Sequence, residues 1–121
     1  MSRRVYISRM FKFEAAHSLP EHKGSCKNVH GHSYTGEVTI SCLEEDMQNG
    51  MVMDYGDLKI IIKEVITGKY DHINLNVIFS NPTAENMVKV IFDHVDNRIN
   101  LPVKLVKVSL KETVNSNCYF M

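Results

Sequence analysis

Two histidines separated by one glycine, His30 and His32, are the side chains that most clearly could do chemistry in this chain of 121 residues. If they lie on a strand, positions i and i+2 point to the same side, so both imidazoles can face one point. His17 has the parity of the apolar side of an earlier alternating segment, so pairing of the two strands would bring three imidazoles together. Three neutral imidazoles with an open fourth position are typical of a catalytic zinc site. Hydrogen-bonded loop and core histidines are the alternative interpretation.

Cys26 lies four residues before His30, in a loop that also carries Lys23 and Lys27. Beside a metal ion and a lysine, a thiol loses its proton more easily, so Cys26 could serve as a base or a nucleophile. It could instead be a fourth zinc ligand, which would make the site structural, or an inert loop cysteine.

Two further places carry groups for proton transfer or ligand binding. Asp71 and His72 are adjacent, and a carboxylate beside an imidazole can orient it or adjust its pKa; the alternative is a loop with capping residues. Glu112 continues the apolar face of a strand, where a carboxylate is costly unless it has a partner. It could bind the edge of a planar, amidine-like ring through two hydrogen bonds, or it could reach water at the strand end.

Alternating apolar and polar residues predict the strands that position these groups. Three strands are predicted over 4–14, 33–43 and 103–112, and a short fourth strand could pair back over 118–121. Arg9 interrupts the apolar side of the first strand. In the third strand, Val106, Val108 and Leu110 are predicted to share one face.

Two helices lie between the two pairs of strands. Apolar residues at i, i+3, i+4 and i+7 from Leu58 to Val65 predict a helix that ends near Gly68. A second helix is predicted to begin at Asn81-Pro82, with Asn81 as its cap, and its apolar stripe runs to Ile99. The order β-β-α-α-β-β predicts an α+β fold with an antiparallel sheet and both helices on one face.

Composition limits the classes of protein to which the chain can belong. The length and a hydrophobic fraction of 44% predict a single globular domain over 1–121. Fourteen Lys and Arg residues balance fourteen Asp and Glu residues, so nothing points to nucleic acid as a partner, and the low net charge favours self-association. The odd cysteine count argues against a disulfide framework, and no segment has the pattern of a membrane span or a signal peptide. We therefore expect a cytoplasmic protein.

Six short motifs follow one another in the order seen in the 6-pyruvoyltetrahydropterin synthase superfamily, which the chain resembles over nearly its whole length. They are Phe-Glu-Ala-Ala-His17, Cys26-x-x-x-His30-Gly-His32, Met53-Asp54-Tyr55, Asp71-His72-x-x-Leu-Asn, Asn81-Pro82-Thr83-Ala-Glu85-Asn86 and Lys111-Glu112-Thr113. The three-residue gap between Cys26 and His30 is similar to that of the bacterial 6-carboxytetrahydropterin synthase branch. Pyruvoyl-forming synthases usually have a longer gap.

This resemblance implies a tunnelling fold and a pterin lyase. In the family, three subunits close a twelve-stranded barrel, and two such trimers stack into a homohexamer. The implied reaction converts 7,8-dihydroneopterin triphosphate to 6-carboxy-5,6,7,8-tetrahydropterin, acetaldehyde and triphosphate. The product feeds the 7-deazaguanine route to queuosine.

The resemblance also implies a role for each candidate residue. Zn2+ would be held by His17, His30 and His32. Cys26 would be the general base, with Asp71 and His72 of a neighbouring subunit completing a proton relay. The pterin would be anchored by Glu112, with Thr113 and Thr83 nearby.

One departure from the family concerns phosphate binding. Ser18 follows the first histidine, where bacterial relatives often have arginine. If that arginine helps to bind phosphate, either His22, Lys23 or Lys27 takes its place or the substrate preference differs. Two other functions remain open. One is a lyase of the same fold with another product, such as 6-pyruvoyltetrahydropterin or a simpler pterin. The other is a non-enzymatic zinc- or pterin-binding module, which requires Cys26 to be a metal ligand or idle.

Overall fold

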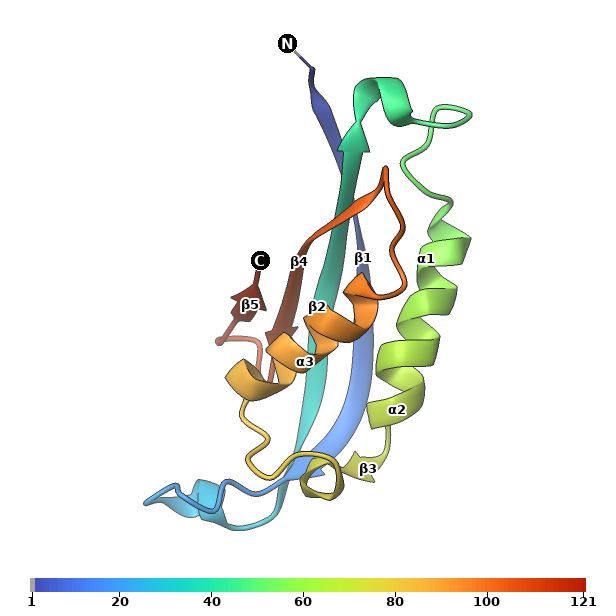
Figure 1. Ribbon diagram of the computed structural model, residues 1–121. Coiled ribbons are helices and arrows are strands. Elements are labelled where there is room, and N and C mark those ends of the chain that lie inside the picture. The colour runs from blue at the N-terminus through green and yellow to red at the C-terminus, as the bar shows by residue number, and fades with distance from the viewer. Residues whose placement is uncertain (1) are drawn as a thin grey trace.

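Two long antiparallel strands form the centre of the sheet in the computed structural model, which describes residues 2–121 (Figure 1). Strand β1 (Arg4–His17) pairs residue for residue with β2 (His30–Leu43), from Arg4 opposite Leu43 to His17 opposite His30. Both strands are longer than predicted, and both extend to the candidate histidines. Odd residues of β1 and even residues of β2 therefore share one face.

The sheet has five strands in the order β3-β1-β2-β4-β5. Strand β4 (Lys104–Lys111) lies antiparallel to β2, and β5 (Cys118–Phe120) pairs back on β4 as predicted. Strand β3 (Ile73–Asn74) was not predicted and lies parallel to β1 at Ala15 and Ala16. A two-residue strand has no periodicity to detect, so the predicted antiparallel sheet is in fact mixed.

A bulge in β4 changes which of its residues face the core. The register with β2 shifts between Thr39 and Ile40, so Val106 is left without a partner and Leu105 lies opposite Ile40. Leu105 packs against the core, together with the fully buried Val108 and Leu110. The prediction that Val106 shares the face of Val108 is wrong, because a bulge interrupts strict alternation.

The first predicted helix is a composite. Helix α1 (Tyr55–Ile62) continues through a π-helical turn (Lys63–Thr67) into the short α2 (Gly68–Tyr70). Asp54 begins it, because its side chain accepts a hydrogen bond from the N–H of Gly56 at 2.7 Å.

The second long helix, α3 (Ala84–Asp96), begins and ends inside the predicted range. Its cap is Thr83, whose hydroxyl accepts a hydrogen bond from the N–H of Asn86 at 3.1 Å. The prediction of Asn81 as the cap is therefore wrong. Asn81 instead accepts a hydrogen bond from the amide of Asn86 through its carbonyl, at 2.9 Å. Short 3-10 turns cover Ser25–Lys27, Glu44–Asp46 and Leu75–Val77.

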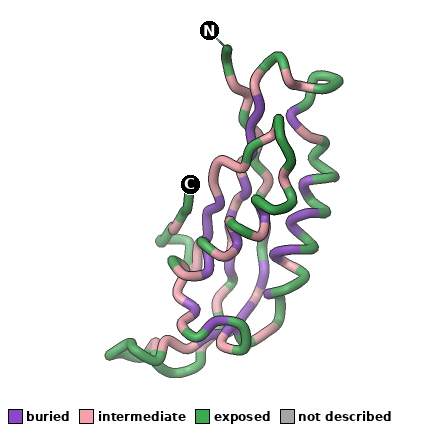
Figure 2. The backbone as a smooth tube through the Cα atoms, viewed as in Figure 1, coloured by how far each residue is buried: buried purple, intermediate pink, exposed green. Residues whose placement is uncertain are grey.

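The helices pack on one face of the sheet, and the core lies between the two layers (Figure 1). Buried residues follow the strands and the inner sides of the helices in Figure 2. The largest fully buried side chains include Phe13, Tyr34, Leu58, Ile91 and Leu110. No helix among the described residues is long and apolar enough to cross a membrane.

Candidate metal centre and active site

Three histidines converge at the end of the β1–β2 pair. His17 and His30 face each other directly in the strand register, and His32 lies opposite Ala15 on the same face. The Nε2 atom of His17 is 3.0 Å from that of His30 and 3.1 Å from that of His32. Strand pairing therefore produces the predicted cluster, and its three side chains could hold a metal ion.

Backbone carbonyls fix the tautomers of two of these rings. The Nδ1 atom of His17 lies 2.8 Å from the carbonyl oxygen of Pro82, and that of His30 lies 2.8 Å from the carbonyl oxygen of Asn28. A carbonyl can only accept a hydrogen bond, so both Nδ1 atoms carry the proton. The lone pairs are then on Nε2, the nitrogen that points into the cluster. Such a contact behind a histidine is typical of metal ligands.

The donor set fits a divalent transition metal. Two Nε2 lone pairs 3.0 Å apart repel each other and cannot form a hydrogen bond without a proton, whereas one cation satisfies both. His17 is fully buried, so water cannot reach it freely. Neutral imidazoles suit zinc, copper, iron and nickel. Within residues 2–121 the group contains no thiol, so Cys26 is not a fourth member.

Burial favours the neutral forms of Tyr34 and His32 at the cluster. The hydroxyl of Tyr34 lies 3.1 Å from Nδ1 of His17, and burial, reinforced by the charge of Glu112, raises the pKa of Tyr34. Burial also lowers the pKa of His32; Glu112 opposes this shift, and His17 and His30 add to it. A lowered pKa favours the neutral imidazole, which is the form that binds a metal.

Glu112 lies between the histidines and a pocket. Its Oε2 atom is 3.9 Å from Nε2 of His32. The same side chain lines a pocket of about 350 Å³ with Glu85, Ser116 and Cys118. Its carboxylate is thus available to a ligand in that pocket, beside the histidine cluster.

The two threonines expected near this carboxylate have other positions. Thr83 uses its hydroxyl to cap α3, and Thr113 is exposed in the turn after β4. Neither lines the pocket that Glu112 lines.

Asp71 and His72 form the expected pair. Oδ2 of Asp71 lies 2.9 Å from Nδ1 of His72, and Oδ1 accepts a hydrogen bond from the N–H of Glu14 at 2.9 Å. The hydrogen bond from Glu14 is the largest cause that lowers the pKa of Asp71, and the contacts with His72 lower it further. His72 has a φ of 61°, a left-handed conformation that costs free energy in a residue other than glycine and often marks a functional position.

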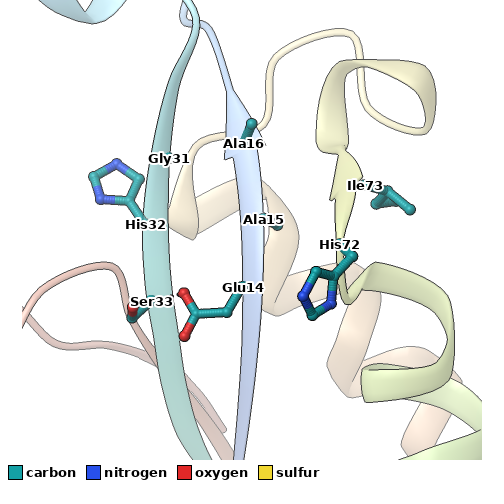
Figure 3. A pocket seen from close by; sticks show the side chains of 8 residues that line it. All are labelled: Glu14, Ala15, Ala16, Gly31, His32, Ser33, His72 and Ile73. Carbon is teal, nitrogen blue, oxygen red and sulfur yellow. Dashed lines mark hydrogen bonds between the residues drawn. The ribbon is translucent and has the colours of Figure 1, made fainter.

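Neither Asp71 nor His72 belongs to the histidine cluster of the same chain. Figure 3 shows the imidazoles of His32 and His72 on opposite sides of β1. Both histidines line one pocket of about 480 Å³, together with Glu14, Ala16 and Ser33. Glu14 and Ala16 have the strand parity opposite to that of His17, so their side chains point to the other face of the sheet.

The loop between β1 and β2 holds the remaining candidates. Cys26 is partly buried in a 3-10 turn, and its carbonyl accepts a hydrogen bond from the N–H of Leu19 at 2.8 Å. Lys23 and Lys27 are exposed. Ser18, where an arginine was expected, is held through its backbone: its N–H donates to the side chain of Asn76 at 2.7 Å, and its carbonyl accepts from that side chain at 3.0 Å.

Residues 6–121 match the sequence profile of the 6-pyruvoyl tetrahydropterin synthase family. The chain belongs to this family. It is 37% identical over 91 residues to a 6-carboxy-5,6,7,8-tetrahydropterin synthase of Synechocystis, covering 71% of this chain and 70% of the relative. It is 38% identical over 102 residues to a dihydroneopterin monophosphate aldolase of Pyrococcus furiosus, covering 83% and 82%. The 6-pyruvoyl tetrahydropterin synthase of Caenorhabditis elegans superposes with a TM-score of 0.84 at 29% identity, covering 98% and 95%. The resemblance seen in the sequence and the α+β fold are thereby confirmed.

Several residues at this pterin synthase site were missed by the sequence analysis. Pro82 and Asn28 act through their carbonyls, which no side-chain pattern reveals. Asn76 holds Ser18 across a long sequence separation. Tyr34 could have been found, since it shares the parity of His32 and follows it by two positions.

Proposed function

We propose that the protein is a zinc-dependent 6-carboxy-5,6,7,8-tetrahydropterin synthase. The observation that carries the proposal is the convergence of three histidine Nε2 atoms, with Glu112 3.9 Å from one of them and facing a pocket. The named relatives, among them the Synechocystis synthase, support this choice. The proposed substrates are 7,8-dihydroneopterin triphosphate and water, and the products are 6-carboxytetrahydropterin, acetaldehyde and triphosphate. We place the reaction in queuosine biosynthesis in the cytoplasm, where a thiol such as Cys26 stays reduced.

The residues around the pocket divide the work of this reaction. Bound at His17, His30 and His32, zinc would supply a Lewis acid for the side-chain hydroxyls of the substrate. Glu112 accepts two N–H groups from the edge of the pterin, a bidentate contact that fixes the ring. Cys26 is the general base that removes a proton from the side chain.

Asp71 and His72 complete the proton relay from a neighbouring subunit. Two observations support this arrangement: neither residue belongs to the histidine cluster of the same chain, and the imidazole of His72 lies on the other side of β1 from that of His32 (Figure 3). The assembly we propose is the homohexamer of two trimers that the family resemblance implies.

Phosphate binding is assigned to the loop between β1 and β2. Lys23 and Lys27 are exposed there and carry the positive charges that the loop offers. The proposed contacts are electrostatic.

A second candidate is the cleavage of a dihydroneopterin monophosphate to a simpler pterin. Two observations favour it: the 38% identity to the Pyrococcus furiosus aldolase, and the serine at position 18 where an arginine would help to bind a triphosphate. A substrate with one phosphate needs fewer cations than a triphosphate. The pyruvoyl-forming reaction is less favoured because of the short gap between Cys26 and His30.

Mass spectrometry of the products distinguishes these reactions. Zinc-loaded protein is incubated with 7,8-dihydroneopterin triphosphate, and separately with the monophosphate. Carboxytetrahydropterin with acetaldehyde, formed from the triphosphate, is the expected result. A pyruvoyl product, or turnover of the monophosphate alone, would overturn the proposal in favour of the sister reaction or the aldolase.

A Cys26→Ala variant tests the assignment of the base. We expect it to retain zinc, because the cluster contains no thiol, and to lose turnover. Loss of zinc would make Cys26 a fourth ligand and the site a structural one. Unchanged turnover would show that Cys26 has no role in the chemistry.

A further inference from the structure

A groove between β1 and α1 is lined by three cationic side chains that the proposed reaction does not use. The pocket there has a volume of about 360 Å³, and its walls include Arg9, Lys59 and Lys63. Thr67 contributes a hydroxyl, and Phe11 and Ile62 form an apolar floor. Helix α1 runs alongside β1 over this length in Figure 1.

Arg9 lies on the side of β1 that faces the helices. It pairs with Val38 in the strand register, and Val38 is fully buried in the core. Every other odd residue from Val5 to Phe13 is apolar, so a guanidinium at this position is costly unless a partner compensates it. Arg9 is partly buried, which increases that cost.

None of the carboxylates among residues 2–121 forms an ion pair with these three cations. Glu64 follows Lys63 directly, but its side chain pairs with Arg98 at 2.7 Å. The groove therefore collects positive charge with no negative charge of this chain to balance it.

The helical segment on the other wall has two features that are unfavourable for a regular α-helix, a pair of like charges and a π-helical turn. Lys59 and Lys63 are four residues apart on one helix face, a like-charge spacing that destabilises a helix. Lys63 and Thr67 are the two ends of the π-helical turn, and such turns are frequent at functional sites. Gly68 permits this turn, because a Cβ atom there would lie 2.5 Å from the carbonyl oxygen of Lys63.

We propose that this groove binds an oxyanion, a phosphate-bearing small molecule. The guanidinium of Arg9 offers a planar pair of donors, the two ammonium groups offer charge, and Thr67 offers a hydroxyl. An apolar floor accommodates an uncharged part of the ligand. The site is separate from the histidine cluster, since the eight residue steps along β1 from Arg9 to His17 span roughly 26 Å.

Calorimetric titration with inorganic phosphate and with tripolyphosphate tests this site in the full chain. We expect saturable binding that Arg9→Gln and Lys63→Gln each weaken about tenfold, because each removes a charged hydrogen-bond donor. One control should bind as the wild type does: Lys104→Gln removes an exposed lysine at the start of β4. The pair Lys23→Gln with Lys27→Gln separates the two sites, because it removes the charges of the proposed active-site loop and should leave the groove site with its full affinity.

Three results would overturn the proposal. The first is no saturable binding of either probe. The second is equal binding by all variants, or loss of binding only in the Lys23 and Lys27 pair, which would place the anion elsewhere. The third comes from sedimentation: if Arg9→Gln changes the oligomeric state and phosphate binding is absent, a carboxylate of a second copy fills the groove instead.

Discussion

Zinc should stabilise this protein against heat, and His17 should be the residue on which that effect depends most. The Nε2 atom of His17 lies 3.0 Å and 3.1 Å from those of the other two histidines, so it is the centre of the cluster. Without a metal, lone pairs face each other in a buried place. A bound cation removes that repulsion, and the folded state gains the free energy of binding.

The size of the effect follows from linkage. A metal that binds only the folded state adds about 2.7 kcal/mol at a free concentration one hundred times its Kd. For a domain of this size, 1 kcal/mol moves Tm by about 4 °C, so zinc should raise Tm by about 10 °C. Differential scanning calorimetry of chelator-treated protein, with and without added zinc, measures the shift.

His17→Ala should lose most of this shift, and His22→Ala, an exposed histidine outside the cluster, should keep it. Cys26→Ala should keep it too, because its thiol is not part of the cluster. An equal zinc-induced shift in His17→Ala and in the wild type would refute the reasoning. Loss of the shift in Cys26→Ala would refute the three-ligand interpretation.

Three other perturbations follow from single contacts. Asp71→Asn should lower kcat by about 10²–10⁴-fold in a product assay, because Asp71 orients the imidazole of His72 for proton transfer. Metal analysis should find unchanged zinc, because Asp71 is not a member of the histidine cluster. Thr83→Ala should cost about 1 kcal/mol in denaturant unfolding through loss of the α3 cap, whereas Thr83→Ser keeps the hydroxyl and most of the stability. Burial raises the pKa of Tyr70 in the folded state above that of the same tyrosine in the unfolded chain. Above about pH 10 the tyrosine therefore ionises first in the unfolded chain, and the free energy of unfolding falls as the pH rises; below that pH the stability is complete. Unfolding at pH 8 and at pH 10.5 should therefore show a smaller alkaline loss in Tyr70→Phe than in the wild type.

Each of these has an outcome that contradicts it. Zinc lost together with activity in Asp71→Asn would place that residue at the metal. Equal stability of the alanine and serine variants at position 83 would mean that the cap contributes nothing. An identical alkaline loss in Tyr70→Phe would mean that other groups determine the pH dependence.

The histidine cluster could be predicted because its causes are local. Strand parity determines the face of each side chain, and one assumption, that the two strands pair, is enough to bring His17 opposite His30. The same parity rule failed at Val106, where a bulge adds one residue and reverses the alternation that follows. Periodicity contains no information about where such a bulge occurs.

The position of the relay could not be predicted from adjacency. The side chain of Asp71 accepts a hydrogen bond from the N–H of Glu14, which lies 57 residues earlier, and the N–H of His72 donates to the carbonyl of Glu14. A two-residue parallel strand follows directly. These long-range contacts involve main-chain groups of β1, which no side-chain pattern in the sequence reveals. The family resemblance supplied the roles of these residues, whereas only the fold shows which side of β1 they occupy.

One short segment joins the histidine cluster to the helix layer. The carbonyl of Pro82 holds Nδ1 of His17, and the next residue, Thr83, caps α3. Any movement of the first turn of α3 therefore shifts the contact that keeps the lone pair of His17 pointing at its neighbours. The segment between Asn81 and Asn86 is predicted as a helix start from the sequence, yet in the structure it also determines the tautomer of a candidate metal ligand. Because the helix cap and the contact to this histidine are on adjacent residues, we expect a capping change here to weaken metal binding without touching a ligand.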